Sequence, residues 1–157
     1  MDVLSWWQAA PWQVMNLPEL DISIWYSPHH PRGDDWGHII HLCEALDDDL
    51  PGGSFQSLRG LKTGRLPEFD PNYPFQVFSV SPEAFAALAR ELDNVSYSFK
   101  QHPFTPMLGG SHFGLRVSRG YQECVVAWHG HFEDQDAQIQ SVYKSVERAG
   151  GINPPTA

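Results

Sequence analysis

The stretch Leu20-Asp21-Ile22-Ser23-Ile24-Trp25-Tyr26 decides the class of fold, because its apolar side chains alternate as they do in a half-buried β-strand. Alternate residues of a strand point to opposite faces. Trp25 points to the face with fewer apolar residues, so we expect it to be exposed or covered by another element. The opposite face carries the larger apolar set: Leu20, Ile22, Ile24 and Tyr26.

A helix is predicted after this strand. Asp34 or Asp35 is suited to cap its N-terminus, and the apolar residues that follow have helical spacing. His38 and His41, three residues apart, would be neighbours beside the buried face. We expect these histidines to lie in solvent or to titrate near physiological pH, with metal binding as an alternative. The apolar face of the predicted helix is Trp36, Ile39, Ile40, Cys43, and Leu46 or Leu50.

The run Asp47-Asp48-Asp49 would lie at the C-terminal end of this helix, where the helix dipole disfavours negative charge. Either it is a solvated helix end with a small electrostatic penalty, or its carboxylates serve binding. The run belongs to an acidic window, residues 19–49, which holds eight acidic residues and one basic residue. This window contributes −7 of the net charge of −9. We therefore predict one strongly acidic face, which repels nucleic acid and attracts basic proteins or cations.

Irregular segments rich in proline, glycine or tryptophan flank these elements. Residues 1–19 combine three tryptophans with two prolines and predict a short helix or an irregular arm over the core. Residues 50–74 contain eight prolines and glycines and predict a long loop with one short strand at about residues 58–66. Long loops in compact domains are often functional. Residues 152–157 are expected to form a loose tail. The long loop holds a basic cluster that we expect to pair with the acidic window: Arg59, Lys62 and Arg65.

The middle of the chain has the plainest signals. Residues 75–80 alternate as a strand, Ser81 is a suitable N-cap, and Pro82 fits the first position of a helix. The apolar face of that helix is Phe85, Leu88, Ala89 and Leu92. Asp93-Asn94 then turns into a second alternating strand over residues 95–99, which completes a predicted β-α-β unit.

A hairpin and a helix are predicted to follow. Residues 113–117 and 121–128 read as paired strands joined at Arg119-Gly120. A helix from about residue 134 to residue 148 comes next, with Gly150-Gly151 as its stop. Its buried face should be Ile139, Val142, Tyr143 and Val146. The complete prediction is a single globular α+β domain, with a mostly antiparallel sheet and about three packed helices.

Length and composition fit a domain that folds without disulfides or metals. Of its 157 residues, 41% are apolar and 18% are charged, and a chain of this size buries about 68–70% of its unfolded surface. Cys43 and Cys124 are expected to be reduced and buried. The first residues have no signal-peptide pattern, and no segment approaches the roughly 20 apolar residues of a membrane span. We therefore expect a soluble, cytoplasmic protein with no membrane partner.

The strongest candidate for a reactive site is the stretch Trp128-His129-Gly130-His131-Phe132-Glu133-Asp134. On a strand, His129 and His131 would point to the same side, and Glu133 or His112 could supply a third metal ligand. The alternative is that these histidines are solvent-facing or hydrogen-bonded at the end of a strand. No metalloprotease, nucleophile or phosphate-loop motif supports an enzyme, so neither a catalytic residue nor a cofactor is predicted.

Tryptophan is concentrated near the acidic window, since five of the six tryptophans lie in the first 36 residues. Tryptophan beside carboxylates is typical of protein-binding hot spots, although large aromatic residues also fill cores. Trp25 is the first interface candidate, because it points away from Ile22 and Ile24. A further interpretation is a small-molecule pocket lined by Trp25, Trp36, Tyr97 and Phe99.

In size, acidity, α+β composition and lack of catalytic motifs, the whole chain resembles the immunity proteins of bacterial toxin systems. The resemblance implies a protein that binds a basic partner, such as a cognate toxin or a nuclease-like enzyme, and occludes its active site. Carboxylates would stand in for an anionic substrate, and electrostatic steering would speed association. No nucleic-acid partner, metal or cofactor is expected. The partner-binding residues would be Trp25, Asp34, Asp35, Asp47, Asp48, Asp49, Glu133 and Asp134.

Overall fold

The computed structural model describes residues 20–28, 37–47, 50–57, 75–96, 110–120 and 122–151. The strands are β1 (Asp21–Ser27), β2 (His38–Asp47), β3 (Leu50–Ser57), β4 (Phe75–Ser79), β5 (Ser111–Arg119) and β6 (Gln122–Gly130). The helices are α2 (Pro82–Asp93) and α3 (Ala137–Ala149), and a short 3-10 turn, η2 (Phe132–Asp134), precedes α3.

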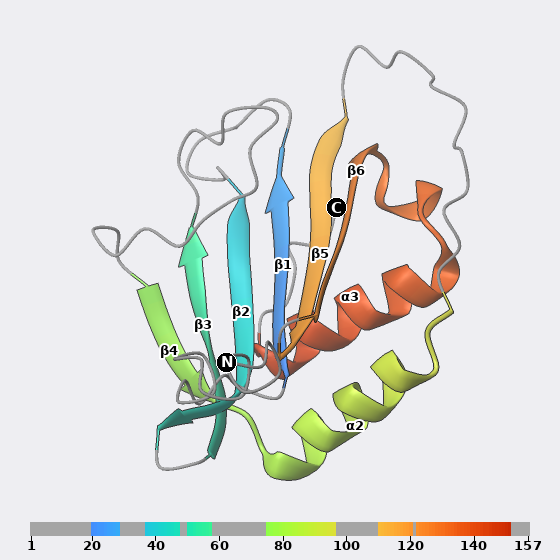
Figure 1. The fold of residues 1–157 in the computed structure, drawn as a ribbon. Helices are drawn as coiled ribbons and strands as arrows, with labels where there is room; N and C mark the ends of the chain where they lie inside the picture. Colours follow the sequence, from blue (N-terminus) through green and yellow to red (C-terminus); the bar gives the residue numbers. More distant parts are fainter. Residues whose placement is uncertain are drawn as a thin grey trace, which may run out of the picture.

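The six strands form one antiparallel sheet in the order β4-β3-β2-β1-β5-β6. The helices α2 and α3 contact each other and pack on one face of this sheet (Figure 1). The predicted α+β class with an antiparallel sheet is therefore confirmed. The described part of the chain has two α-helices, so the expectation of about three is wrong there.

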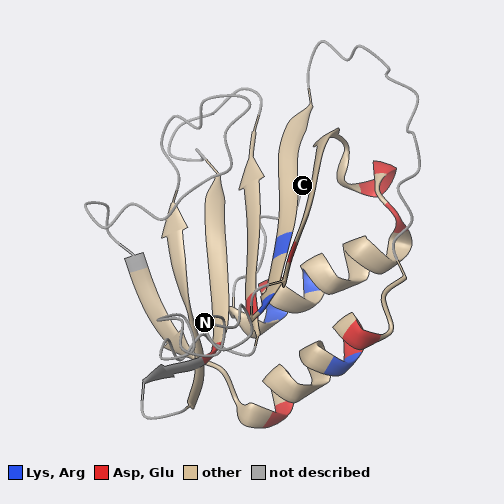
Figure 2. Cartoon of the chain, viewed as in Figure 1, with Lys and Arg blue, Asp and Glu red and all other residues tan. Residues whose placement is uncertain are grey.

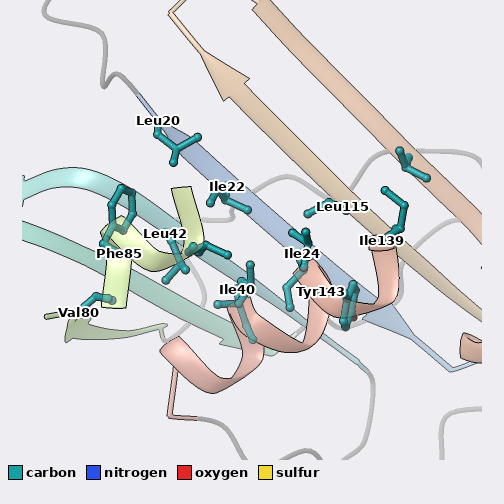
Figure 3. Close-up of a cluster of buried hydrophobic side chains, with 14 residues drawn as sticks. Leu20, Ile22, Ile24, Ile40, Leu42, Val80, Phe85, Leu115, Ile139 and Tyr143 are labelled. Carbon is teal, nitrogen blue, oxygen red and sulfur yellow. The ribbon is translucent and has the colours of Figure 1, made fainter. Parts of the chain in front are cut away.

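Strand β1 lies in the centre of the sheet and confirms the alternation predicted for residues 20–26. Ile22 and Ile24 are fully buried in the main core between the sheet and the two helices (Figure 3). Tyr143 of α3 reaches the same strand, and its hydroxyl donates a hydrogen bond of 2.9 Å to the carbonyl of Trp25. Burial of apolar surface is the dominant favourable term in folding. The buried side chains of β1 therefore help to hold the sheet and the helices together.

Strand β2 replaces the helix predicted from Asp34 or Asp35 onward, so that prediction is wrong. Its apolar residues are buried on both faces, with Ile40 in the core under the helices and Ile39 on the opposite side. A strand buried on both faces reads as an almost continuous apolar run, and such a run also satisfies helical spacing. Two adjacent β-branched residues and pairing with β1 and β3 favour the strand.

Strand β3 occupies the first eight residues of the segment predicted to be a loop, so the loop prediction is wrong for residues 50–57. The remainder of that segment, including the short strand expected near residues 58–66 and its basic cluster, lies outside the described residues. One of the glycines that suggested a loop, Gly53, has a packing reason instead. A Cβ on Gly53 would overlap the side chains of Leu42 and Phe78, so the strand needs glycine at this close approach.

The strand and helix predicted around Ser81 are confirmed. The Ser81 hydroxyl caps α2 by accepting a hydrogen bond of 3.1 Å from the backbone nitrogen of Ala84, and Pro82 lies in the first turn. After α2, Val95 and Ser96 are not in a strand. The strand expected over residues 95–99, which would complete a β-α-β unit, is therefore absent at residues 95 and 96, and residues 97–99 lie outside the described residues.

The C-terminal hairpin and helix are also confirmed. Strands β5 and β6 pair directly, with Gly120 at a φ of 55° in the turn between them. Helix α3 begins three residues later than predicted, because residues 132–134 form the η2 turn and Asp136 supplies the cap. Its four predicted core residues are all buried: Ile139, Val142, Tyr143 and Val146. Neither α2 nor α3 is long and apolar enough to cross a membrane.

Candidate functional site

Asp47, the first residue of the acidic run, ends strand β2 rather than a helix, and we call residues 47–49 the acidic turn because they connect β2 to β3. Asp47 is the last residue of β2 and pairs with Leu50, the first residue of β3. Asp48 and Asp49 fall between them and, like the side chain of Asp47, are outside the described residues. The expected conflict with a helix dipole therefore does not arise, because strands carry only small net dipoles.

Other described acidic residues lie at the same end of the sheet as this acidic turn. Asp21 opens β1 and pairs with Cys43, and the backbone nitrogen of Glu44 donates to the carbonyl of Leu20 at 3.2 Å. Helix α2 also starts here, and its first turn contains Glu83; Figure 2 shows an acidic residue in red at this end of α2. Asp21, Glu44 and Glu83 thus lie at one end of the sheet, which we call the acidic end.

An apolar groove of about 790 Å³ opens at the acidic end. Leu50 lines its rim, is 58% exposed, and pairs with Asp47 across the ends of β2 and β3. A single exposed apolar side chain is normal, whereas a contiguous apolar surface rimmed by polar groups marks an interaction site, and Leu50 adjoins the apolar lining of this groove. The rest of the apolar lining comes from the ends of β1 and β3 and from α2: Leu20, Pro51, Pro82, Phe85, Ala86 and Ala89.

The groove also contains four charged residues, and they are unevenly paired. Arg119 forms an ion pair of 2.7 Å with Asp93 and donates a hydrogen bond of 3.4 Å to the carbonyl of Ala89. Arg90 lies one helical turn before Asp93 and forms no ion pair with any described residue. Glu44 lines the groove close to the acidic turn. The groove is therefore acidic near β2 and β3 and basic where α2 meets β5.

Glu133 and Asp134, the other predicted binding residues, lie at the opposite end of the sheet. They belong to η2, which follows the last residue of β6, whereas Glu123 at the start of β6 lies at the acidic end. The seven residue steps between Glu123 and Gly130 span roughly 24 Å at about 3.4 Å per residue. Both side chains are exposed, and the Asp134 carboxylate accepts a hydrogen bond of 3.0 Å from the backbone of His131. The structure therefore separates them from Asp47.

Sequence analysis expected Trp25 to be either exposed or covered. Trp25 is 5% exposed, so it is buried and not exposed. Its predicted direction is confirmed, because it packs with Ile39 and Val125 on the face away from the main core. The indole lies against Gly114 of β5, where a Cβ would overlap three ring atoms. Trp25 is thus a packing residue with almost no accessible surface for a partner. The other predicted interface or pocket residues lie outside the described ranges: Asp34, Asp35, Trp36, Tyr97 and Phe99.

The predicted histidine site is rearranged in the structure. Strand β6 ends at Gly130, whose φ of 130° breaks the alternation, so His129 and His131 do not share a strand face. His112 and His129 do lie together as a direct cross-strand pair, with ring centroids 4.5 Å apart. Across the described ranges, no three His, Cys, Asp or Glu residues are arranged to hold a metal ion.

His38 and His41 lie on opposite faces of β2, so the two cannot chelate one metal. His38 contacts the rings of Tyr26 and Phe55 on the core side. His41 is on the other face and forms a hydrogen bond of 2.8 Å with the carboxylate of Asp21, diagonally across from it on β1. Sequence reasoning missed this pair because it placed His41 on a helix. A strand prediction for residues 38–47 would have put both side chains on one face of the sheet.

Burial shifts the pKa values of two groups on α3. Burial raises the pKa of Tyr143 well above its ordinary value, and the nearby Glu147 and Tyr26 raise it further. Burial likewise raises the pKa of Glu147, and Lys144 opposes that shift by a smaller amount. Both groups are therefore held toward their neutral forms beside the core, away from the acidic end.

The two cysteines are reduced, as expected, but only one of them is buried. Cys43 is buried on β2 rather than on a helix. Cys124 is exposed on β6, so the expectation that it is buried is wrong.

Comparison of the chain with protein-family models, with curated proteins and with solved structures found no match. The functional argument therefore depends on the geometry of the described residues.

Proposed function

We propose that this protein is a binding module whose acidic end docks on a basic protein and occludes the partner's active site, without catalytic chemistry of its own. One observation carries the proposal. The acidic turn at Asp47 places an exposed Leu50 on the rim of an apolar groove, with further carboxylates at the same end of the sheet. This is the composition of an interface: an apolar anchor with charge around it.

The two parts of this surface have different physical roles. Leu50 and the groove supply apolar area that is removed from water on contact, which gives binding energy. The carboxylates attract a basic partner from a distance and set its orientation. An enzyme that acts on an anionic substrate has a basic active site, which such a surface would fill. This is the mechanism that the resemblance to toxin-neutralising immunity proteins implies.

Three of the residues expected from the sequence are not part of the proposed surface. Trp25 is buried, and the segment with Glu133 and Asp134 lies at the other end of the sheet. The remaining candidates are Asp47, Asp48 and Asp49 in the acidic turn, and Asp34 and Asp35, which lie outside the described residues. The structure adds Leu50, which sequence analysis offered as an alternative to Leu46 on the apolar face of a helix. Its exposure follows from the hairpin between β2 and β3, which no helical pattern could indicate.

Affinity capture with charge-reversed variants tests the proposal. The tagged full-length protein is incubated with native lysate at low and moderate salt, and the retained proteins are identified by mass spectrometry. Asp47→Lys with Asp48→Lys should abolish capture of a basic partner. Glu133→Lys with Asp134→Lys changes the net charge by the same amount at the far end and should leave capture nearly unchanged. Equal loss in both variants would show a general charge effect and contradict a localised docking surface.

A second measurement addresses occlusion directly. The captured partner is purified, and its enzymatic activity is measured with increasing amounts of this protein. Complete inhibition near one equivalent is expected, with weaker inhibition by the Asp47→Lys, Asp48→Lys variant. A bound partner that retains full activity would exclude the neutralising role, even if the docking surface were correct.

A further inference from the structure

A second cavity, of about 370 Å³, lies between the two helices and the hairpin of β5 and β6. Its walls are almost entirely aliphatic. The residues that matter to the argument are Leu92, Val95, Leu115, Val117, Ile139 and Val142. Away from Asp93 and Arg119, this lining offers no strong hydrogen-bond partners that would retain water, so that part of the cavity favours an apolar guest.

The size of the cavity indicates how large that guest would be. An engineered cavity of about 150 Å³ lined by Leu, Ile and Phe stays dry and binds benzene, so a volume of 370 Å³ leaves room for a chain of roughly ten carbon atoms. Each methylene transferred from water to such a site contributes favourably to binding. The cavity is therefore suited to a medium-length aliphatic chain.

The polar end of the cavity indicates which head group the chain would carry. Asp93 and Arg119 line both this cavity and the groove at the acidic end, so their ion pair marks the boundary between the two. A guanidinium has five N–H donors, and the contacts of Arg119 with Asp93 and Ala89 leave donors for a second carboxylate. Arg90 lies on the groove side of the boundary without an acidic partner in the described structure. At this boundary the two guanidinium groups face one carboxylate, Asp93, while the second carboxylate of the groove, Glu44, lies on β2.

We propose that this cavity binds an aliphatic carboxylate of roughly ten carbons. The chain lies between α2, α3 and the β5–β6 hairpin, and the carboxylate contacts Arg119, with Arg90 nearby, at the boundary with the groove. The site uses neither the acidic turn nor a basic partner, so it stands or falls independently of the proposed function.

A cysteine built into the cavity wall supplies the readout. Cys124 lines the cavity and is exposed, whereas Cys43 is 5% exposed and lies elsewhere. The full-length protein is treated with a maleimide in the presence of decanoate below its micelle concentration, and the rate of Cys124 modification is measured by mass spectrometry. Saturating decanoate should slow this modification at least about fivefold, while acetate, which lacks the chain, should not. Decyltrimethylammonium, which has the chain and the opposite charge, should bind at least about tenfold more weakly by calorimetry, as the loss of one charge-assisted contact implies.

Variants then separate the cavity from the surface. Val117→Trp should fill the cavity and abolish decanoate binding, whereas Val77→Trp places the same side chain on the exposed edge strand β4 and should leave binding intact. If Val117→Trp does not fold, Val95→Trp fills the same cavity from a position outside the helices and strands. Arg119→Gln should weaken decanoate about tenfold. Decanoate affinity that is unchanged in the filled variants, or equal affinity for the cationic amphiphile, would overturn the proposal.

Discussion

At the scale of single residues, Trp25 packs directly against Gly114 on the face of the sheet away from the helices. Three ring atoms of the indole occupy the place where a Cβ on residue 114 would lie. Gly114→Ala should therefore lower the free energy of unfolding by about 2 kcal/mol, because overpacking a filled site forces the backbone or the ring to move. Urea denaturation of both proteins measures this difference.

A double-mutant cycle identifies the cause of that loss. In a Trp25→Ala background the ring is absent, so Gly114→Ala should cost close to nothing and the coupling energy should be about 2 kcal/mol. If the cost of Gly114→Ala were the same in both backgrounds, it would come from the backbone of β5 and the packing argument would fail.

Glu147 predicts a dependence of stability on pH. Burial raises its pKa above the ordinary value of 4.5, so the folded protein binds this proton more tightly than the unfolded chain does. The stabilisation from Glu147 is therefore complete below pH 4.5 and is lost as the pH rises through the raised, folded-state pKa. Glu147→Gln carries no charge at any pH. Its free energy of unfolding, measured against that of the wild-type protein, should improve between acidic and neutral pH by roughly 0.5 kcal/mol or less, since solvent still screens this side chain.

An exposed carboxylate provides the comparison for Glu147. Glu133→Gln removes a charge in η2 that has little burial, so its effect on the free energy of unfolding should change less between the same two pH values. An improvement for Glu147→Gln at acidic rather than neutral pH would have the wrong sign and contradict the role of burial.

At the scale of secondary structure, the elements that could be predicted from the sequence are those with a local start, turn or stop signal, such as a capping residue or a glycine. Ser81 and Pro82 mark the start of α2, Gly120 the turn of a hairpin, and Gly150 the end of α3. Strand β2 has no such mark. Its apolar run fits both the helical and the strand period. Pairing with β1 on one edge and with β3 on the other selects the strand.

The candidate site was predictable only in part, for a related reason. The excess of acidic residues in the window of residues 19–49 is a property of the sequence alone. The exposure of Leu50 and the separation of Glu133 from Asp47 depend on strand register, which is set by pairing across the sheet. The burial of Trp25 depends on Gly114, a residue almost ninety positions away along the chain.

The carboxylate of Glu91 forms hydrogen bonds between the two helices, so we expect its substitution to lower stability. Glu91 of α2 accepts hydrogen bonds from the hydroxyls of Ser141 and Ser145 on α3, at 2.6 Å and 2.7 Å. Glu91→Ala should lower the free energy of unfolding by about 1–2 kcal/mol, because both bonds involve a charged acceptor and are partly open to solvent. Thermal or urea unfolding checks this value.

The same helix offers a matched control for Glu91. Glu83 is exposed in the first turn of α2 and accepts no described hydrogen bond from α3, so Glu83→Ala should cost only about 0.5 kcal/mol through the helix dipole. Equal losses for the two substitutions would mean that the bonds to α3 contribute nothing measurable.

At the scale of the whole molecule, charge and apolar surface are arranged along the strand direction. The acidic turn, the exposed Leu50 and the groove share one end of the sheet, while η2 lies at the other. The cavity proposed for an aliphatic carboxylate opens beside the groove, with Arg119 and Asp93 common to both. Occupation of that cavity would add a negative head group next to the docking surface.

This arrangement predicts that association with a basic partner divides into two kinetic parts. Charges at the rim act during the approach, so Asp47→Lys with Asp48→Lys should lower the association rate and reduce its dependence on salt. Leu50 acts only after contact, so Leu50→Ser should leave the association rate unchanged and raise the dissociation rate by about tenfold, since losing a buried leucine side chain costs 1.5 kcal/mol or more. Stopped-flow or surface-binding kinetics with the captured partner at two salt concentrations resolve the two effects. If Leu50→Ser altered only the association rate, the apolar rim would not be part of the bound interface.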